Sequence, residues 1–171
     1  MLQIIIVGDE SPGKTTFLQN LCTNLFIHDY RMTIGVDLTK KDVSVDGQRV
    51  HLQIWDLNGQ PSFRFYISNY FEGAKGGLFL YDVTDRSSIA CIDDWLNIIQ
   101  KDIRVEEILP ILVVGILPDE RNKRQISTEE GVKIARTRNL NGYIECNPKT
   151  GENVEKAFEA LTGLMLDGLG Y

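Results

Sequence analysis

Eight residues near the start of the chain have the types and spacing that bind phosphate. The run Gly8-Asp9-Glu10-Ser11-Pro12-Gly13-Lys14-Thr15 fits G-x-x-x-x-G-K-S/T and lies between an apolar run, Leu2 to Val7, and a helix-like stretch. Glycines let the backbone turn around an anion, and successive amides and the positive end of the following helix point at it. Lys14 would reach the outer phosphates, and Thr15 would offer a hydroxyl to Mg²⁺. The sequence therefore predicts a phosphate-binding loop for a nucleotide.

A second group of polar residues follows a predicted strand, at Trp55-Asp56-Leu57-Asn58-Gly59-Gln60. An aspartate at such a position can hold a Mg²⁺-bound water, and a glycine can turn its amide toward a terminal phosphate. A glutamine can orient an attacking water. Asp56, Gly59 and Gln60 are therefore candidates for the metal, the phosphate and the reaction.

The strands that would position these residues are read from apolar runs, which alternate with amphipathic stretches and so predict an α/β fold. Continuous apolar or β-branched residues predict buried strands at Leu2 to Val7, Gly77 to Val83, Ile111 to Ile116 and Gly142 to Cys146. The dipeptide Asp46-Gly47 favours a tight turn, joining Val36 to Val45 with Arg49 to Trp55 as an antiparallel pair. Parallel strands with a phosphate loop after the first place the ligand at the carboxyl edge of the sheet.

Helices are expected in four stretches, namely Lys14 to Cys22, Ser87 to Gln100, Ser127 to Arg138 and Glu152 to Leu166. In the last of them, apolar residues recur at 3.6-residue spacing and mark the face that packs on the sheet: Val154, Phe158, Leu161 and Met165.

Composition sets the class of protein. With 171 residues, 43% of them hydrophobic and 25% charged, the chain can bury one substantial core, and we expect a single domain over residues 1–171. The net charge is −6, and no run of five basic residues occurs, which argues against nucleic acid or a bare anionic membrane as a direct partner. Three cysteines without metal-ligand spacing indicate reduced thiols in the cytoplasm. We expect no membrane span, signal peptide or direct lipid anchor.

Further segments resemble the small GTPases of the Ras superfamily, specifically the Rab type. They are YRMTIGVDL at 30–38, HLQIWD at 51–56, YFEGA at 70–74 and LFLYDVT at 78–84. The resemblance covers essentially the whole chain. It implies a P-loop NTPase fold, with a six-stranded, mostly parallel sheet that has one antiparallel strand and is flanked by five helices. It also implies two switch segments that sense the nucleotide, with guanine nucleotide and Mg²⁺ as ligands.

The resemblance implies a role for each matching residue. Lys14 and the amides of Ser11 to Thr16 would bind phosphates. Thr15, Thr33 and Asp56 would hold Mg²⁺, and Thr33 would reach the metal only while a γ-phosphate is present, which ties the order of Phe26 to Leu38 to GTP. The ring of Phe26 would lie against the base, although a loop aromatic that covers the core is the alternative. Nucleotide-binding residues would thus be Ser11, Gly13, Lys14, Thr15, Thr16, Phe26, Thr33, Gly59, Asp119 and Lys149.

An apolar trio matches the residues with which Rab proteins read protein effectors. Leu38, Trp55 and Tyr70 stand where those proteins carry Phe, Trp and Tyr, so the first is smaller here. The resemblance implies effectors and regulators that bind through the two switches. An ordinary apolar patch beside the core is the alternative.

The base-binding motifs depart from the family pattern. Ile116-Leu117-Pro118-Asp119 replaces Asn-Lys-x-Asp, and Asp119 keeps a carboxylate that can accept from both guanine N1 and N2; a solvated loop acid is the alternative. Asn147-Pro148-Lys149 replaces Ser-Ala-Lys. Because Pro148 has no N–H, the amide that the family uses for guanine O6 is absent, unless the Asn147 amide substitutes for it.

These observations favour a Rab-like GTP-binding switch that hydrolyses GTP slowly, with Gln60 positioning the attacking water. The alternative from another class is a pseudo-GTPase, an interaction module with weak or non-cycling nucleotide binding. Retention of Asp56, Gly59 and Gln60 argues for the enzyme, and the altered base motifs argue for the module. A phosphate-loop ATPase is a third hypothesis, which Asp119 disfavours.

Overall fold

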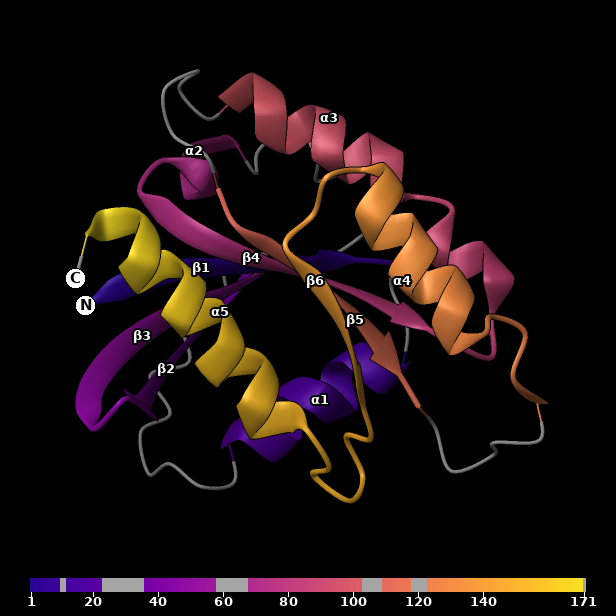
Figure 1. Cartoon of the computed structure of the whole chain (residues 1–171), viewed down its shortest axis with the longest axis horizontal. Helices are drawn as coiled ribbons and strands as arrows, with labels where there is room; N and C mark the ends of the chain where they lie inside the picture. The colour runs from indigo at the N-terminus through magenta and orange to yellow at the C-terminus, as the bar shows by residue number, and fades with distance from the viewer. Residues whose placement is uncertain (10–11, 23–35, 58–67, 103–108, 118–122, 171) are drawn as a thin grey trace.

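The computed structural model describes residues 1–9, 12–22, 36–57, 68–102, 109–117 and 123–170. Six strands form one sheet in the order β2-β3-β1-β4-β5-β6 (Figure 1). The strands are β1 (Leu2–Gly8), β2 (Val36–Val45), β3 (Gln48–Leu57), β4 (Ala74–Asp82), β5 (Ile111–Ile116) and β6 (Gly142–Cys146). Only the β2–β3 pairing is antiparallel, so the expected mostly parallel sheet is confirmed.

The helices cover both faces of this sheet. They are α1 (Pro12–Cys22), α2 (Ser68–Phe71), the 3-10 helix η2 (Arg86–Ile89), α3 (Ile92–Asp102), α4 (Thr128–Thr137) and α5 (Val154–Leu169). Figure 1 shows α1 and α5 on one face and α2, α3 and α4 on the other. None of the helices in the described part of the chain has the length and apolar character that crossing a bilayer requires.

The two cores follow from the alternation of side chains along β1. Ile4 and Ile6 pack in the cluster under α1 and α5, whereas Ile5 and Val7 pack in the cluster under α3 and α4. The α5 residues with helical spacing, Val154, Phe158, Leu161 and Met165, are all buried, as the sequence predicts. Fully buried strands on both faces explain why β5 reads as the continuous apolar run ILVVGI.

The β2–β3 hairpin forms where Asp46-Gly47 predicts it. Val45 pairs with Gln48, so the loop has two residues, and both have positive φ (51° and 80°). Such a turn matches the twist of the flanking strands, and glycine takes the second position without steric cost. The hairpin places the antiparallel strand at the edge of the sheet.

The prediction of one continuous helix from Ser87 to Gln100 is wrong, because two helices cover this segment. The segment divides into η2 and α3. Asp85 caps η2 by accepting from the Ser87 N–H, and the backbone bonds of Ser88 to Asp85 and of Ala90 to Ser87 span three residues, as in a 3-10 turn, before α3 begins. The buried residues Ile89, Ile92, Trp95 and Ile99 keep a helical spacing across the break. Hydrophobic periodicity therefore runs through a point where the backbone hydrogen bonding changes.

Candidate functional site

The phosphate-loop sequence lies between β1 and α1, as predicted. β1 ends at Gly8, and α1 begins at Pro12, a position where the missing N–H of proline costs no helical hydrogen bond. A Cβ on Gly13 would lie 2.7 Å from Cγ2 of Ile116, which is itself buried. The close approach of α1 to the end of β5 therefore depends on a glycine, and an apolar contact joins the two elements where the family pattern has an asparagine.

Lys14 and Asp56 meet at the carboxyl edge of the sheet. The ammonium Nζ of Lys14 lies 2.6 Å from Oδ1 of Asp56 and donates to the Leu57 carbonyl oxygen at 2.7 Å. Lys14 is only 5% exposed, and 43 residues separate it from Leu57 in the sequence. Burial raises the pKa of the Asp56 carboxyl, and the Lys14 ammonium opposes that shift. The fold thus brings the two most specific motifs of the sequence into one polar centre.

Several predicted site residues lie outside the described residues: Ser11, Phe26, Thr33, Gly59, Gln60 and Asp119, together with the side chain of Thr15. Their roles stay predictions. Of the remaining phosphate-loop residues, Gly13 lies in the first turn of α1, where amides have no helical acceptor, and Thr16 follows in the next turn. Lys149 is exposed in the loop after β6.

Of the three predicted magnesium ligands, Asp56 is the one whose side chain the structure describes. It supplies hard carboxylate oxygens, which suit Mg²⁺, and it is partly buried at the end of β3 beside a second carboxylate, Asp37, that further raises its pKa. Among the described residues, no cluster of three or more His, Cys, Asp or Glu side chains forms a site by itself. The donor chemistry fits a hydrated cation that takes its other ligands from a nucleotide and from hydroxyl groups.

The segment after β5 is tied to β6 by an ion pair. Arg124 donates from both terminal nitrogens to Glu145, at 2.9 Å each, across 21 residues of sequence. Glu145 also accepts from Thr128 at 2.9 Å and from the Tyr143 hydroxyl at 2.7 Å, and the Tyr143 hydroxyl lies 2.9 Å from that of Tyr81. The Arg124 guanidinium holds the pKa of Glu145 at about 2. Burial raises the pKa of Tyr81 to about 12. We call these five residues the Glu145 network.

Two glycines make room for the Glu145 network. A Cβ on Gly115 of β5 would lie 2.6 Å from the Tyr143 hydroxyl, and a Cβ on Gly131 of α4 would meet the Tyr143 ring. No motif in the sequence singles out this network. Its members come from four separate segments of the chain. Predicting their contacts from the sequence would require knowing which strands are neighbours in the sheet.

In the loop after β6, the Asn147 amide does not take the place of the amide that Pro148 lacks. The Asn147 N–H donates to the Glu152 carbonyl oxygen at 3.0 Å, so it is not available to replace the amide that Pro148 lacks. Leu117 packs partly against the core under α3 and α4, and its N–H donates to the Cys146 carbonyl oxygen at 2.8 Å. Internal contacts therefore hold the loop after β6 and the first residue after β5, Leu117.

The apolar trio is brought together by the hairpin and α2. Leu38 pairs with Trp55 across β2 and β3, and the rings of Trp55 and Tyr70 lie 4.9 Å apart at 52°. All three residues are half-buried. The Trp55 Nε1 is buried without a hydrogen-bond partner among the described residues. The geometry makes one continuous patch beside Asp56.

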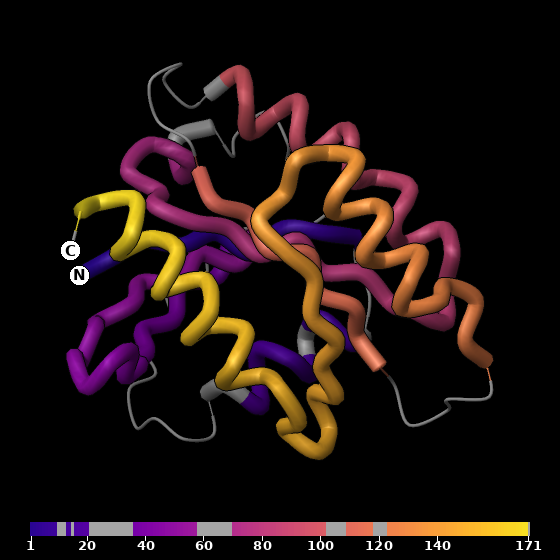
Figure 2. Tube along the Cα trace, in the orientation of Figure 1, coloured from indigo at the N-terminus to yellow at the C-terminus, as the bar shows by residue number. Residues whose placement is uncertain are grey.

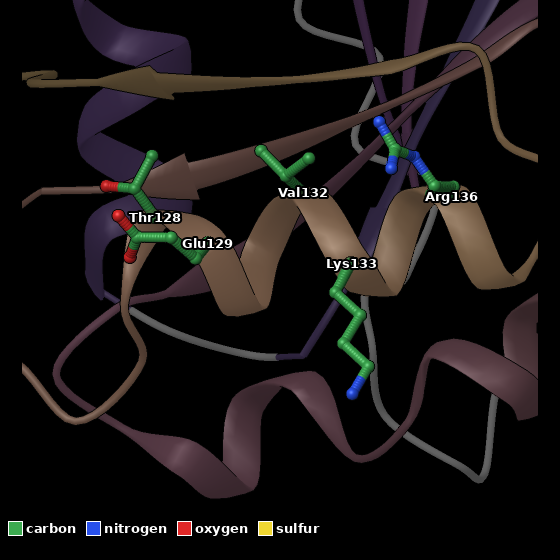
Figure 3. Close-up of a pocket in the computed structure, with 5 residues that line it drawn as sticks. All are labelled: Thr128, Glu129, Val132, Lys133 and Arg136. Carbon is green, nitrogen blue, oxygen red and sulfur yellow. The ribbon is translucent and has the colours of Figure 1, made fainter.

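A separate surface hollow of about 270 Å³ lies along α4 (Figure 3). Its lining comes from one helix: Thr128, Glu129, Val132, Lys133 and Arg136. It contains none of the residues that the sequence assigns to nucleotide binding, and it touches the Glu145 network only through Thr128.

A strand, a phosphate loop and a helix at the first strand of this sheet, with an aspartate at the end of the neighbouring strand, define a phosphate-loop nucleotide-binding protein of the α/β class. A sequence model of the Ras family matches residues 3–167. The chain therefore belongs to the Ras family, and it is a Rab-like small GTPase.

Individual relatives agree with this assignment. The chain is 37% identical to the Ras-related protein Rab-1 of Theileria parva over 98% of its own length and 75% of that protein. It is 33% identical to the Ras-related protein Rab-18-B of Danio rerio, with 99% and 81% covered. It is 36% identical to the Ras-related protein RIC1 of Oryza sativa subsp. japonica, with 95% and 79% covered.

Proposed function

We propose that this chain is a molecular switch that binds GTP, hydrolyses it slowly to GDP and signals to protein effectors from the cytoplasm. The observation that carries the proposal is the contact of Lys14 with Asp56. It joins the lysine of the phosphate loop to the carboxylate expected at the metal. A site that held only one of these groups would lack either the charge for phosphates or the oxygen donors for a cation.

Within this proposal, Lys14 and the amides of residues 11–16 hold the phosphates at the start of α1. Thr15, Thr33 and Asp56 hold Mg²⁺, which when bound neutralises charge on the phosphate oxygens. Gly59 turns its amide to the terminal phosphate, and Gln60 orients the water that attacks it in line.

The base and the effectors occupy opposite sides of the phosphates in this proposal. Phe26, Asp119 and Lys149 surround the base, and the Asp119 carboxylate accepts from its N1 and N2. Effectors contact the patch of Leu38, Trp55 and Tyr70, which adjoins Asp56 at the end of β3. Thr33 and Gly59 would order the two switch segments next to that patch only with GTP bound.

The second candidate is a pseudo-GTPase, an interaction module whose nucleotide does not cycle. Its support is the internal bonding of the loop after β6, which removes a base contact, together with Ile116 and Leu117 in place of the asparagine and lysine. Under this reading, the patch of Leu38, Trp55 and Tyr70 would bind partners whatever the nucleotide.

The nucleotide that co-purifies with the protein separates these candidates. We expect chromatography of the extracted nucleotide to give GDP, with or without GTP, near one molecule per chain. Recovery of GTP alone after prolonged incubation would support the pseudo-GTPase. Recovery of ADP or ATP in its place would contradict guanine recognition.

A further inference from the structure

The loop from Asn147 to Glu152 uses every one of its backbone N–H groups internally. The Asn147 N–H donates to the Glu152 carbonyl oxygen at 3.0 Å, and the Gly151 N–H donates to the Asn147 carbonyl oxygen at 2.9 Å. The Glu152 N–H donates to the Thr150 hydroxyl at 3.3 Å. These bonds close the loop on itself.

The Asn147 side chain takes the two N–H groups that remain. Its Oδ1 accepts from the Lys149 N–H at 3.0 Å and from the Thr150 N–H at 3.2 Å, as a turn-forming asparagine does. Asn147 is 4% exposed, and Pro148 has no N–H to offer. No backbone donor in this loop is therefore left for a ligand.

The loop nevertheless lies at the edge of the sheet that carries the phosphate-loop sequence. It follows β6 at the same edge of the sheet at which β1 enters the phosphate loop, because both strands belong to the parallel part of the sheet. A Cβ on Gly151 would lie 3.3 Å from Oδ1 of Asn20 on α1, the helix that begins at the phosphate loop. Figure 2 shows the yellow-orange loop beside this indigo helix.

We propose that the nucleotide site of this chain does not read the substituent at position 6 of a guanine base, and that Asn147 and Pro148 together make it insensitive. The inference rests on the proposed function and adds a specificity to it. A 6-oxo group is recognised by a hydrogen-bond donor, and the backbone N–H groups of the loop expected at the base are already bonded to acceptors on Asn147, Thr150 and Glu152. The loss of this donor does not affect recognition of the N1 and 2-amino groups of the base.

The test compares GDP with 6-thio-GDP, which keeps the N1 and 2-amino donors but carries a poor acceptor at position 6. Both are titrated calorimetrically into the native protein and into Pro148→Ala, which restores one N–H in the loop. Pro110→Ala is the matched control, because it adds an N–H just before β5, at the edge of the sheet away from the phosphate loop. We expect the native protein and Pro110→Ala to bind the two compounds within about twofold of each other. Pro148→Ala should favour GDP by about fivefold, the value of one neutral hydrogen bond.

The outcomes distinguish a failure of the proposed function from a failure of this inference. Binding of neither compound by the native protein would contradict the proposed function. A native protein that prefers GDP over 6-thio-GDP by fivefold or more would overturn this inference and leave the proposed function intact. This measurement uses the native protein alone, so it does not depend on whether a variant folds. A Pro148→Ala protein with a native circular dichroism spectrum and no preference would also overturn it, because the missing amide would then not be the cause.

Discussion

Lys14 and Asp56 illustrate how single residues define the site. Either charge alone would be costly at this depth, and the Lys14 ammonium both pairs with the Asp56 carboxylate at 2.6 Å and donates to the Leu57 carbonyl oxygen. Incoming phosphates carry their own negative charge. Lys14 can therefore exchange a carboxylate partner for a phosphate partner while it remains paired.

Replacing Lys14 by alanine should abolish nucleotide binding, because the buried positive charge that faces the phosphates is lost. Calorimetric titration with GDP and Mg²⁺ measures the effect, and we expect an affinity at least about a hundredfold lower, in line with about 3 kcal/mol for a charge-assisted contact. Lys41→Ala is a matched control, since Lys41 is also buried but pairs with Glu155 at 3.7 Å. Equal GDP affinity in Lys14→Ala and Lys41→Ala would refute the phosphate-loop assignment.

At the scale of elements, the Glu145 network connects β4, β6, α4 and the segment before α4. Arg124 reaches Glu145 on β6 from just beyond residues 118–122, the stretch that contains Asp119. Asn153, which precedes α5, donates to the Glu145 carbonyl oxygen at 3.0 Å. One carboxylate residue thus organises the ends of both segments that would flank the base.

Glu145 should make stability depend on acid pH. Its pKa falls from 4.5 to about 2 in the folded protein, so its stabilising effect is complete above the unfolded-state value and is lost as the pH falls from about 4.5 to about 2. We expect Glu145→Gln to lower the free energy of unfolding by about 1–3 kcal/mol at pH 7. Urea unfolding at several pH values should show this difference shrinking below pH 4.5. Glu159→Gln on α5 is the control, and a Glu145→Gln difference that persists unchanged at low pH would contradict the role of this ion pair.

Local sequence predicted the elements well where a local interaction decides them. Asp46-Gly47 specifies the hairpin, and the spacing of Val154, Phe158, Leu161 and Met165 specifies the buried face of α5. The sequence does not predict the break between η2 and α3, because the apolar spacing continues across it while the backbone hydrogen bonds change from a 3-10 to an α pattern.

The site divides in the same way. The phosphate-loop pattern and the strand-end Asp56 are visible in the sequence because they follow strands that can be read locally. The sequence does not reveal two other features, because they depend on how the chain folds back on itself. These are the Arg124–Glu145 ion pair and the hydrogen bonds of Asn147 with Lys149, Thr150 and Glu152. The tertiary structure alone shows that the Asn147 amide is occupied.

For the molecule as a whole, nucleotide binding should stabilise the fold, because the ligand binds residues that only folding brings together. At a free GDP concentration a hundred times its dissociation constant, with Mg²⁺ present, the gain is about 2.7 kcal/mol. In a domain of this size this corresponds to an increase of about 5–10 °C in the melting temperature. Differential scanning calorimetry with GDP, and with ADP as the comparison, measures it. A larger shift with ADP than with GDP would contradict a guanine site.

The central claim is that this small GTPase binds GTP and hydrolyses it with Gln60, and single-turnover phosphate release from GTP-loaded protein tests it most directly. We expect slow release from the native protein and at least about tenfold slower release from Gln60→Leu at unchanged GTP affinity, because only the orientation of the attacking water is lost. Gln48→Leu, an exchange of the same chemistry at an exposed position of the hairpin, should release phosphate at the native rate. Absence of release from the native protein, or equal rates in the native protein and Gln60→Leu, would contradict the account.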